Sequence, residues 1–282
     1  MDEVTVYHLK QMHFDRSAPL DRVMATDVAM SQYNIAKQLW NEPGAYVFSE
    51  GWDENITAYN RQRFVSKIPN VDALSIIFEK GLPEKFENLT VEQRTLLLQL
   101  GAPWILLALG RTGSLLRTIS RELQQEIKAD LAEGGTEKAV ESGLIFDRRE
   151  KECLELISEY LKKRTPGSAE KVFLIFGGAH DFRALGNDFN LLVKPVETLR
   201  AARLMNWIMS ISVRAERIAI GIDTSKRVGF WSAVAATAQV LLLRWVRNVL
   251  YALRCTLIRL TVPGSARYKW TRQTSSGRKS LL

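Results

Sequence analysis

The chain has 282 residues, 46% hydrophobic and 25% charged, a globular composition with enough apolar side chains for a sizeable core. Three histidines exclude a histidine-rich metal tract, and two widely separated cysteines argue against a disulfide framework. The net charge of +8 is unevenly distributed: residues 224–282 hold eleven basic residues and no acid, which leaves 28 basic and 31 acidic residues in the rest. A near-neutral body therefore carries a purely basic tail.

The first fifty residues predict a strand, a helix and a second strand. The run VTVYHL at 4–9 is rich in β-branched and aromatic residues, which favours a strand with His8 as a core or sheet-face residue. Residues 19–40 repeat apolar side chains at helical spacing and predict a helix. The segment AYVFSE at 45–50 follows a Pro-Gly turn and predicts the second strand.

Helices are predicted through the middle of the chain. Thr90 and Gln93 have the spacing of a capping box, which opens a helix. Gly81 before them and Gly101 after them are expected to mark helix ends. This part of the chain therefore predicts a large helical insertion after the second strand.

The second half of the body predicts two more helices and then two strands. Helical patterns cover residues 108–133 and 149–163, with the loop-like EGGTE at 133–137 between them. KVFLIF at 171–176 and FNLLVKPV at 189–196 predict strands. Because VFLIF is apolar at every position, we expect helices on both faces of that strand. The predicted fold class is α/β, with a central parallel or mixed sheet flanked by helices.

Polar residues follow directly on three of the predicted strands. His13, Glu50 and His180 each come after the apolar part of a strand. If these strands are parallel, all three residues lie at the carboxyl edge of one sheet, where open α/β sheets bind their ligands. Gly177 and Gly178 precede His180 and allow the backbone to approach a ligand, so their N–H groups could hold an anion or an oxyanion.

Several of these residues form motifs that occur together in one superfamily. Gly177-Gly178-Ala179-His180 is a GxxH motif after an apolar strand, Glu50 ends the second strand, and Arg149-Glu150 opens a later helix. In this order the motifs resemble the superfamily that groups the TraB and Tiki proteins, the ChaN-like haem-binding proteins and the erythromycin esterases. The resemblance implies that Arg149 lies near the strand ends.

The first motif of that superfamily is altered in this chain. LKQMH at 9–13 has Lys10 where the motif has glycine and Gln11 where several relatives carry an acid, but it keeps His13. The resemblance covers residues 3–200.

The resemblance and the residue types together suggest an acyl hydrolase. His13, Glu50 and His180 could supply a general base, or could bind a divalent metal with positions left for water. Arg149 could hold a carbonyl, phosphate or carboxylate group. The expected function is therefore cleavage of an ester or peptide bond in a small-molecule or peptide substrate, with or without a metal. The alternative is a non-catalytic module of the ChaN-like kind that binds haem or another small ligand at the same cleft.

Structural roles remain open for each of these residues. His13 and His180 could simply satisfy backbone groups at strand ends. Glu50 could be an exposed loop acid, and Arg149 could belong to the first turn of a solvated helix. Under these alternatives the four residues share no site.

The basic tail makes a separate prediction. Residues 228–243 carry no charge, but as a helix they span only about 24 Å, short of the hydrocarbon core of about 30 Å, which argues against a transmembrane span. Residues 244–260 place arginines on one side of a predicted amphipathic helix, which suits an anionic membrane surface. Packing on the body or on a second subunit is the alternative, and the lack of a recognition motif argues against nucleic acid.

These patterns divide the chain into three parts. An α/β domain is expected at 1–223, a basic amphipathic helical segment at 224–265 and a disordered tail at 266–282. The sequence shows no pattern of a secretory signal and its cysteines suit a reducing compartment. We therefore expect a cytoplasmic protein that is peripheral at the cytoplasmic face of the membrane.

Overall fold

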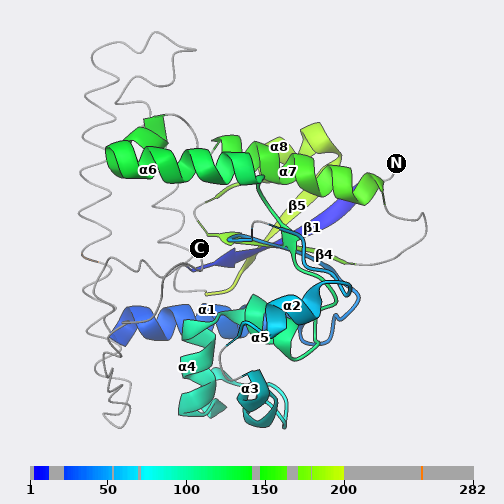
Figure 1. Ribbon diagram of the computed structural model, residues 1–282, viewed down its shortest axis with the longest axis vertical. Helices are drawn as coiled ribbons and strands as arrows, with labels where there is room; N and C mark the ends of the chain where they lie inside the picture. Colours follow the sequence, from blue (N-terminus) through cyan, green and yellow to red (C-terminus); the bar gives the residue numbers. More distant parts are fainter. Residues whose placement is uncertain are drawn as a thin grey trace.

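A computed structural model describes residues 3–12, 22–52, 54–68, 71–141, 147–163, 171–178 and 180–199, together with Val249. These residues form a five-stranded, fully parallel sheet in the order β3-β2-β4-β1-β5, with helices on both faces (Figure 1). The predicted α/β class is confirmed. The strands are β1 (Val4–Gln11), β2 (Tyr46–Ser49), β3 (Leu116–Arg117), β4 (Val172–Gly177) and β5 (Leu191–Glu197).

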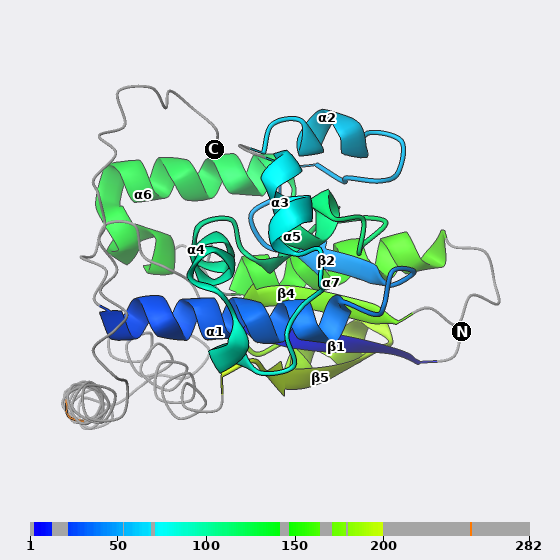
Figure 2. The same cartoon turned by 90° about the horizontal axis from the view of Figure 1, so that it is seen from below.

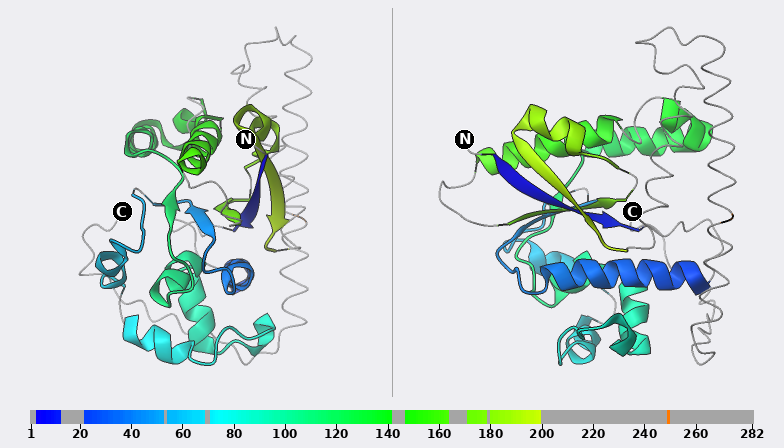
Figure 3. Two further views of the ribbon diagram at one scale, coloured as in Figure 1. Left: turned by 90° about the vertical axis from the view of Figure 1, so that its right-hand side faces the viewer. Right: turned by 180° about the vertical axis from the view of Figure 1, so that it is seen from behind.

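The helices form two layers. One face of the sheet is covered by α1 to α5 and the other by α6, α7 and α8 (Figures 1, 2 and 3). The helices are α1 (Arg22–Leu39), α2 (Arg61–Val65), α3 (Val71–Ile77), α4 (Val91–Gln99), α5 (Ala102–Ala108), α6 (Arg121–Glu141), α7 (Asp147–Lys162) and α8 (Arg183–Gly186), with 3₁₀ turns at Phe86–Asn88 and Asn187–Phe189.

Strand β4 lies in the middle of the sheet and is apolar on both sides. Phe173 and Ile175 belong to the core cluster that contains residues of α1 and α5, whereas Leu174 and Phe176 belong to the cluster that contains residues of α7. All four side chains are at most 5% exposed. The unbroken apolar run in the sequence therefore has the predicted cause, two helical layers over one strand.

The order of the strands makes the carboxyl ends of β2 and β4 the topological switch point of the sheet, and we call this position the crevice. These strands are neighbours, but the chain leaves β2 towards β3 through α2 to α5 and leaves β4 towards β5 through α8, on the opposite face (Figure 1). Neighbouring connections that diverge in this way leave a gap in which α/β proteins bind ligands.

The helical insertion between β2 and β3 has the predicted signals at its helix ends. Thr90 Oγ1 accepts a hydrogen bond from Gln93 N at 3.1 Å, and Gln93 Oε1 accepts one from Thr90 N at 3.0 Å, so the capping box is confirmed. Gly81 and Gly101 both have φ of +80°, a conformation that favours glycine. Both stand at ends of helical segments, as expected.

Two predicted boundaries between β2 and α7 are wrong. The helix expected at 108–133 is split, because Gly110 has φ of +70° after the end of α5 and the chain then forms β3 before α6 begins at Arg121. The loop expected at 133–137 lies inside α6. A glycine costs a helix interior only about 1 kcal/mol, so two glycines do not end a helix when their surroundings favour it.

Some of the sequence predictions fall outside the described residues. The predictions for His13 and for the tail that begins at residue 224 are among them. In the tail, only Val249 is described. In the part of the chain that is described, no helix combines the length and the apolar character that crossing a membrane requires.

Candidate functional site

Glu50 joins three elements at the crevice. It follows β2 directly, and its backbone N–H donates to the carbonyl of Ile175 at 2.9 Å. In its side chain, Oε1 accepts a hydrogen bond from Arg149 Nη2 in the first turn of α7, and Oε2 accepts one from Gly177 N at 3.0 Å. The side chains of Glu50 and Arg149 are each 15% exposed. The carboxylate therefore links β2, β4 and α7 in a largely dry environment.

His180 is held by Glu150, the residue that follows Arg149 in α7. Its Nδ1 lies 3.0 Å from Glu150 Oε1, and the same oxygen accepts a hydrogen bond from Asp181 N at 3.2 Å. The backbone N–H of His180 donates to Gly177 O at 3.1 Å, which closes a tight turn after β4. An ionised carboxylate only accepts hydrogen bonds, so it places the proton of a neutral imidazole on Nδ1. Glu150 thereby fixes the direction of the ring.

Aromatic rings support both side-chain pairs, Glu50–Arg149 and Glu150–His180. The His180 ring packs edge-on against Phe176 at 4.6 Å and lies stacked beside Phe182 at 6.0 Å between centroids. Arg149 Cζ lies 5.0 Å from the centre of the Phe176 ring, within the range of a cation–π interaction. One apolar support therefore holds the imidazole and the guanidinium at the same edge of the sheet.

His8 lies beneath this cluster and is part of the core, as predicted. It is 1% exposed, its Nε2 lies 3.3 Å from Phe176 O, and its ring packs edge-on against Phe182 at 4.9 Å. Burial lowers the pKa of His8 from 6.5 to about 3, and electrostatic interactions with His180 and Lys10 lower it further. His8 is therefore neutral at physiological pH.

Lys10, which replaces the motif glycine, joins β1 to β5. Lys10 of β1 and Glu197 of β5 are register partners across the two strands, and Lys10 Nζ lies 2.9 Å from Glu197 Oε1. The carbonyl of Lys10 also accepts a hydrogen bond from Thr198, just after β5. The side chain that departs from the motif is therefore satisfied by an ion pair beside the crevice.

The position of Glu50 does not suit a metal ligand. Both of its oxygens are engaged, and a divalent cation there would lie against the guanidinium of Arg149. Among the described residues, no group of three or more His, Cys, Asp and Glu side chains could hold a metal. With His13 outside the described residues, the ligand set His13, Glu50 and His180 stays a prediction.

The structure brings Glu50, Arg149, Gly177 and His180 together and adds Glu150 as the partner of the imidazole. The sequence signal for Glu150 was its place in the Arg-Glu pair that opens α7. The N–H groups of the two glycines are already engaged: Gly177 N donates to Glu50, and Gly178 N donates to Gln11 O at 2.9 Å. Arg149 is therefore a better donor for an incoming ligand than these amides.

Cys153 lies one turn further along α7 and is not a candidate nucleophile. It is fully buried, and burial together with the charge of Glu50 raises the pKa of its thiol well above the ordinary value. The thiolate form is therefore strongly disfavoured. Its packing role is that of a small apolar side chain.

No known family model matches the chain, and neither a curated protein nor a solved structure matches it. The resemblance to the TraB, Tiki, ChaN-like and erythromycin esterase superfamily therefore stays a prediction from the motifs.

Proposed function

We propose that the chain is a hydrolase that cleaves an ester or peptide bond at the crevice between β2 and β4. The observation that carries the proposal is the His180–Glu150 pair, 3.0 Å apart, with side chains 7% and 12% exposed. An imidazole oriented by a carboxylate is the arrangement by which many hydrolases prepare a general base.

The four polar side chains of the crevice have separate roles in this reaction. His180 takes a proton from water at Nε2, because Nδ1 is held by Glu150. Arg149 donates hydrogen bonds to the substrate carbonyl and stabilises the negative charge that forms on its oxygen. Glu50 holds the guanidinium in position through Nη2. Glu50 is thus a positioning residue rather than the base, since its carboxylate is already paired with a cation.

The steps conserve atoms and charge. As water loses its proton to His180, its oxygen forms a bond to the carbonyl carbon, and the carbonyl electrons move to the oxygen that Arg149 contacts. When the tetrahedral species collapses, the bond to the leaving alcohol or amine breaks. The imidazolium of His180 returns the proton to that leaving group.

A hydrolysis screen with the purified full-length protein tests the proposal. Aryl esters, alkyl esters and short peptides are incubated with the wild type and with His180→Gln, which removes the base. We expect turnover of at least one substrate class and a loss of about 100-fold or more in the variant, the range of general-base catalysis. Equal rates for the two proteins at unchanged thermal midpoints, or no turnover in any class, would refute the proposal.

The same histidine supports a second candidate function, non-catalytic binding of haem or another small ligand. Proteins commonly hold a metal-ligating imidazole by a carboxylate on its other nitrogen, as Glu150 holds His180. The two functions differ in their readouts. Saturable haem binding that is lost in His180→Gln, together with no hydrolysis by the wild type, would favour the binding module.

We further propose that the tail attaches the protein to anionic membranes. Its support is the charge count, eleven basic residues and no acid from residue 224 onward. Each Lys or Arg close to an anionic surface is worth about 1 kcal/mol, so even four would shift binding by several kcal/mol.

Liposome sedimentation of the full-length protein and of a protein ending at Asp223 tests this attachment. The full-length protein should pellet with vesicles in proportion to their anionic lipid, and salt should weaken the binding because it screens charges beyond about 10 Å at 0.1 M. The shortened protein should stay in the supernatant. Equal pelleting of the two proteins would contradict the proposal.

A further inference from the structure

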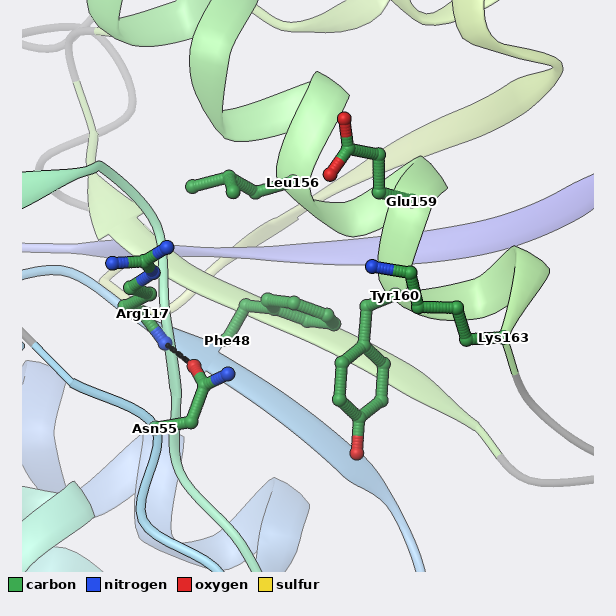
Figure 4. A pocket seen from close by; sticks show the side chains of 7 residues that line it. All are labelled: Phe48, Asn55, Arg117, Leu156, Glu159, Tyr160 and Lys163. Atoms are coloured by element: carbon green, nitrogen blue, oxygen red, sulfur yellow. Dashed lines mark hydrogen bonds between the residues drawn. The ribbon is translucent and has the colours of Figure 1, made fainter.

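A second polar site lies on the face of the sheet that α7 covers. It is near the carboxyl end of α7, whereas the crevice is near the amino end. A pocket of about 130 Å³ opens between that helix and the edge of the sheet at β2 and β3 (Figure 4). Along the helix, Glu159 at the pocket is nine residues from Glu150 at the crevice, or about 14 Å. The pocket is lined by Phe48, Asn55, Arg117, Leu156, Glu159, Tyr160 and Lys163.

The floor and one wall of the pocket are aromatic. Phe48 is 1% exposed, and Tyr160 packs edge-on against it with 5.7 Å between ring centroids. In Figure 4 the Phe48 ring lies between Arg117 and the Tyr160 ring. These surfaces suit the flat apolar part of a small ligand.

The other groups of the pocket are mainly hydrogen-bond donors. Asn55 Oδ1 accepts from the backbone N–H of Arg117 at 3.0 Å, and this bond directs the Asn55 amide NH₂ towards the pocket (Figure 4). The guanidinium of Arg117 stands on the same side, and the ammonium group of Lys163 stands across from them (Figure 4). Glu159 at the rim is the single carboxylate of the lining.

These donors have no partner among the described residues. No hydrogen bond or ion pair within that part of the chain engages the side-chain nitrogens of Asn55, Arg117 or Lys163. Two cations against one anion leave the pocket positive. Donors in excess of acceptors, beside aromatic rings, fit a ligand that brings anionic oxygens on a flat body.

We propose that this pocket binds a small planar carboxylate. The flat part of the ligand lies against Phe48 and Tyr160. Its carboxylate accepts hydrogen bonds from Arg117 and Asn55, while Lys163 adds positive potential at the opposite side. The pocket volume of about 130 Å³ limits the ligand to the size of a single ring with a short substituent.

Fluorine NMR titration of the full-length protein with 4-fluorobenzoate tests the proposal. Saturable binding is expected with a dissociation constant of about 1 mM or lower, reasonable for a ligand of this size. The neutral analogue 4-fluorobenzyl alcohol should bind at least about tenfold more weakly, because a hydrogen bond to a charged group is stronger than one to a neutral group. Inorganic phosphate should compete poorly, since it has no flat body.

Variants of the lining locate the site. Arg117→Met should weaken binding of 4-fluorobenzoate by about tenfold or more, and Lys163→Met by a few-fold, whereas Lys162→Met, a neighbouring exposed lysine outside the lining, should bind like the wild type. The thermal midpoint reports whether each variant is folded. The proposal is overturned by a lack of saturable binding, by equal affinity for the neutral analogue, by full competition from phosphate, or by wild-type affinity in folded Arg117→Met and Lys163→Met.

Discussion

The two ends of α7 present polar groups of two different kinds. At the first turn, Arg149 and Glu150 are each paired, with Glu50 and with His180. Near the last turn, Lys163 faces Arg117 across the pocket, and neither side chain has a partner among the described residues.

This difference is the basis of our two proposals, chemistry at the paired groups and ligand binding at the unpaired ones. Groups held by partners keep one direction before a substrate arrives, which lowers the cost of reaching the transition state. Donors that lack a protein partner can instead be satisfied by a ligand. We therefore propose hydrolysis at the first turn of α7 and ligand binding near its other end.

Removing the guanidinium at the first turn should have the largest effect. Arg149→Met takes away the donor to the carbonyl oxygen, and loss of one such donor typically costs about 100- to 1,000-fold in rate. The matched control is Arg148→Met, because Arg148 pairs with Glu126 on the exposed side, where both side chains are about half exposed. Steady-state kinetics should show a severe loss in the first variant and near wild-type activity in the second. Equal activity of the two variants would remove Arg149 from the mechanism.

Stability should respond differently at the two ends of the helix. Glu50→Gln leaves the guanidinium of Arg149 largely buried without its counter-charge, which we expect to cost about 2–3 kcal/mol of unfolding free energy, below the value for fully buried pairs because 15% of each side chain is exposed. Arg117→Met removes a charge that has no partner among the described residues and should leave stability nearly unchanged. Urea denaturation measures both variants. Similar unfolding free energies for Glu50→Gln and Arg117→Met would contradict the proposed difference between paired and unpaired charges.

The buried His8 should make the crevice end of the fold sensitive to acid. Its pKa is lowered from 6.5 to about 3, so between these values the unfolded chain binds a proton that the folded chain does not. Its contribution to stability is therefore complete above pH 6.5 and declines as the pH falls towards 3, by about 1.4 kcal/mol per pH unit.

Urea denaturation at a series of pH values separates this contribution from those of the carboxylates. His8→Gln cannot take up the proton, so its unfolding free energy should fall less steeply than that of the wild type between pH 6 and pH 4. Identical slopes for the two proteins would show that His8 is not held neutral by the fold.

The sequence predicted the features that depend on local patterns. The apolar run of β4, the strand ending at Glu50 and the helix beginning near Arg149 all follow from residue spacing. Parallel pairing then places the ends of β2 and β4 at one edge, which needs no knowledge of side-chain contacts. The two-residue strand β3 is too short to leave a periodic signal, and among the described residues β2 is its one neighbouring strand.

The partners within each site could not be predicted in the same way. His180 and Glu150 are 30 residues apart, and Asn55 and Arg117 are 62 residues apart. Such pairs depend on how α7 and the edge of the sheet pack, and nothing in the local sequence encodes them. The pair of Glu50 and Arg149, 99 residues apart, likewise depends on where the first turn of α7 lies relative to the end of β2.

The central claim is that Glu150 prepares His180 for hydrolysis. The most direct test compares the rate of hydrolysis by the wild type, by Glu150→Gln and by Glu155→Gln, whose carboxylate lies 4.0 Å from Lys151 at the surface of the same helix. We predict that Glu150→Gln remains folded and loses about 100-fold or more in kcat/KM, because the imidazole loses the carboxylate that orients it. Glu155→Gln should behave like the wild type. Wild-type kinetics in folded Glu150→Gln would contradict the account.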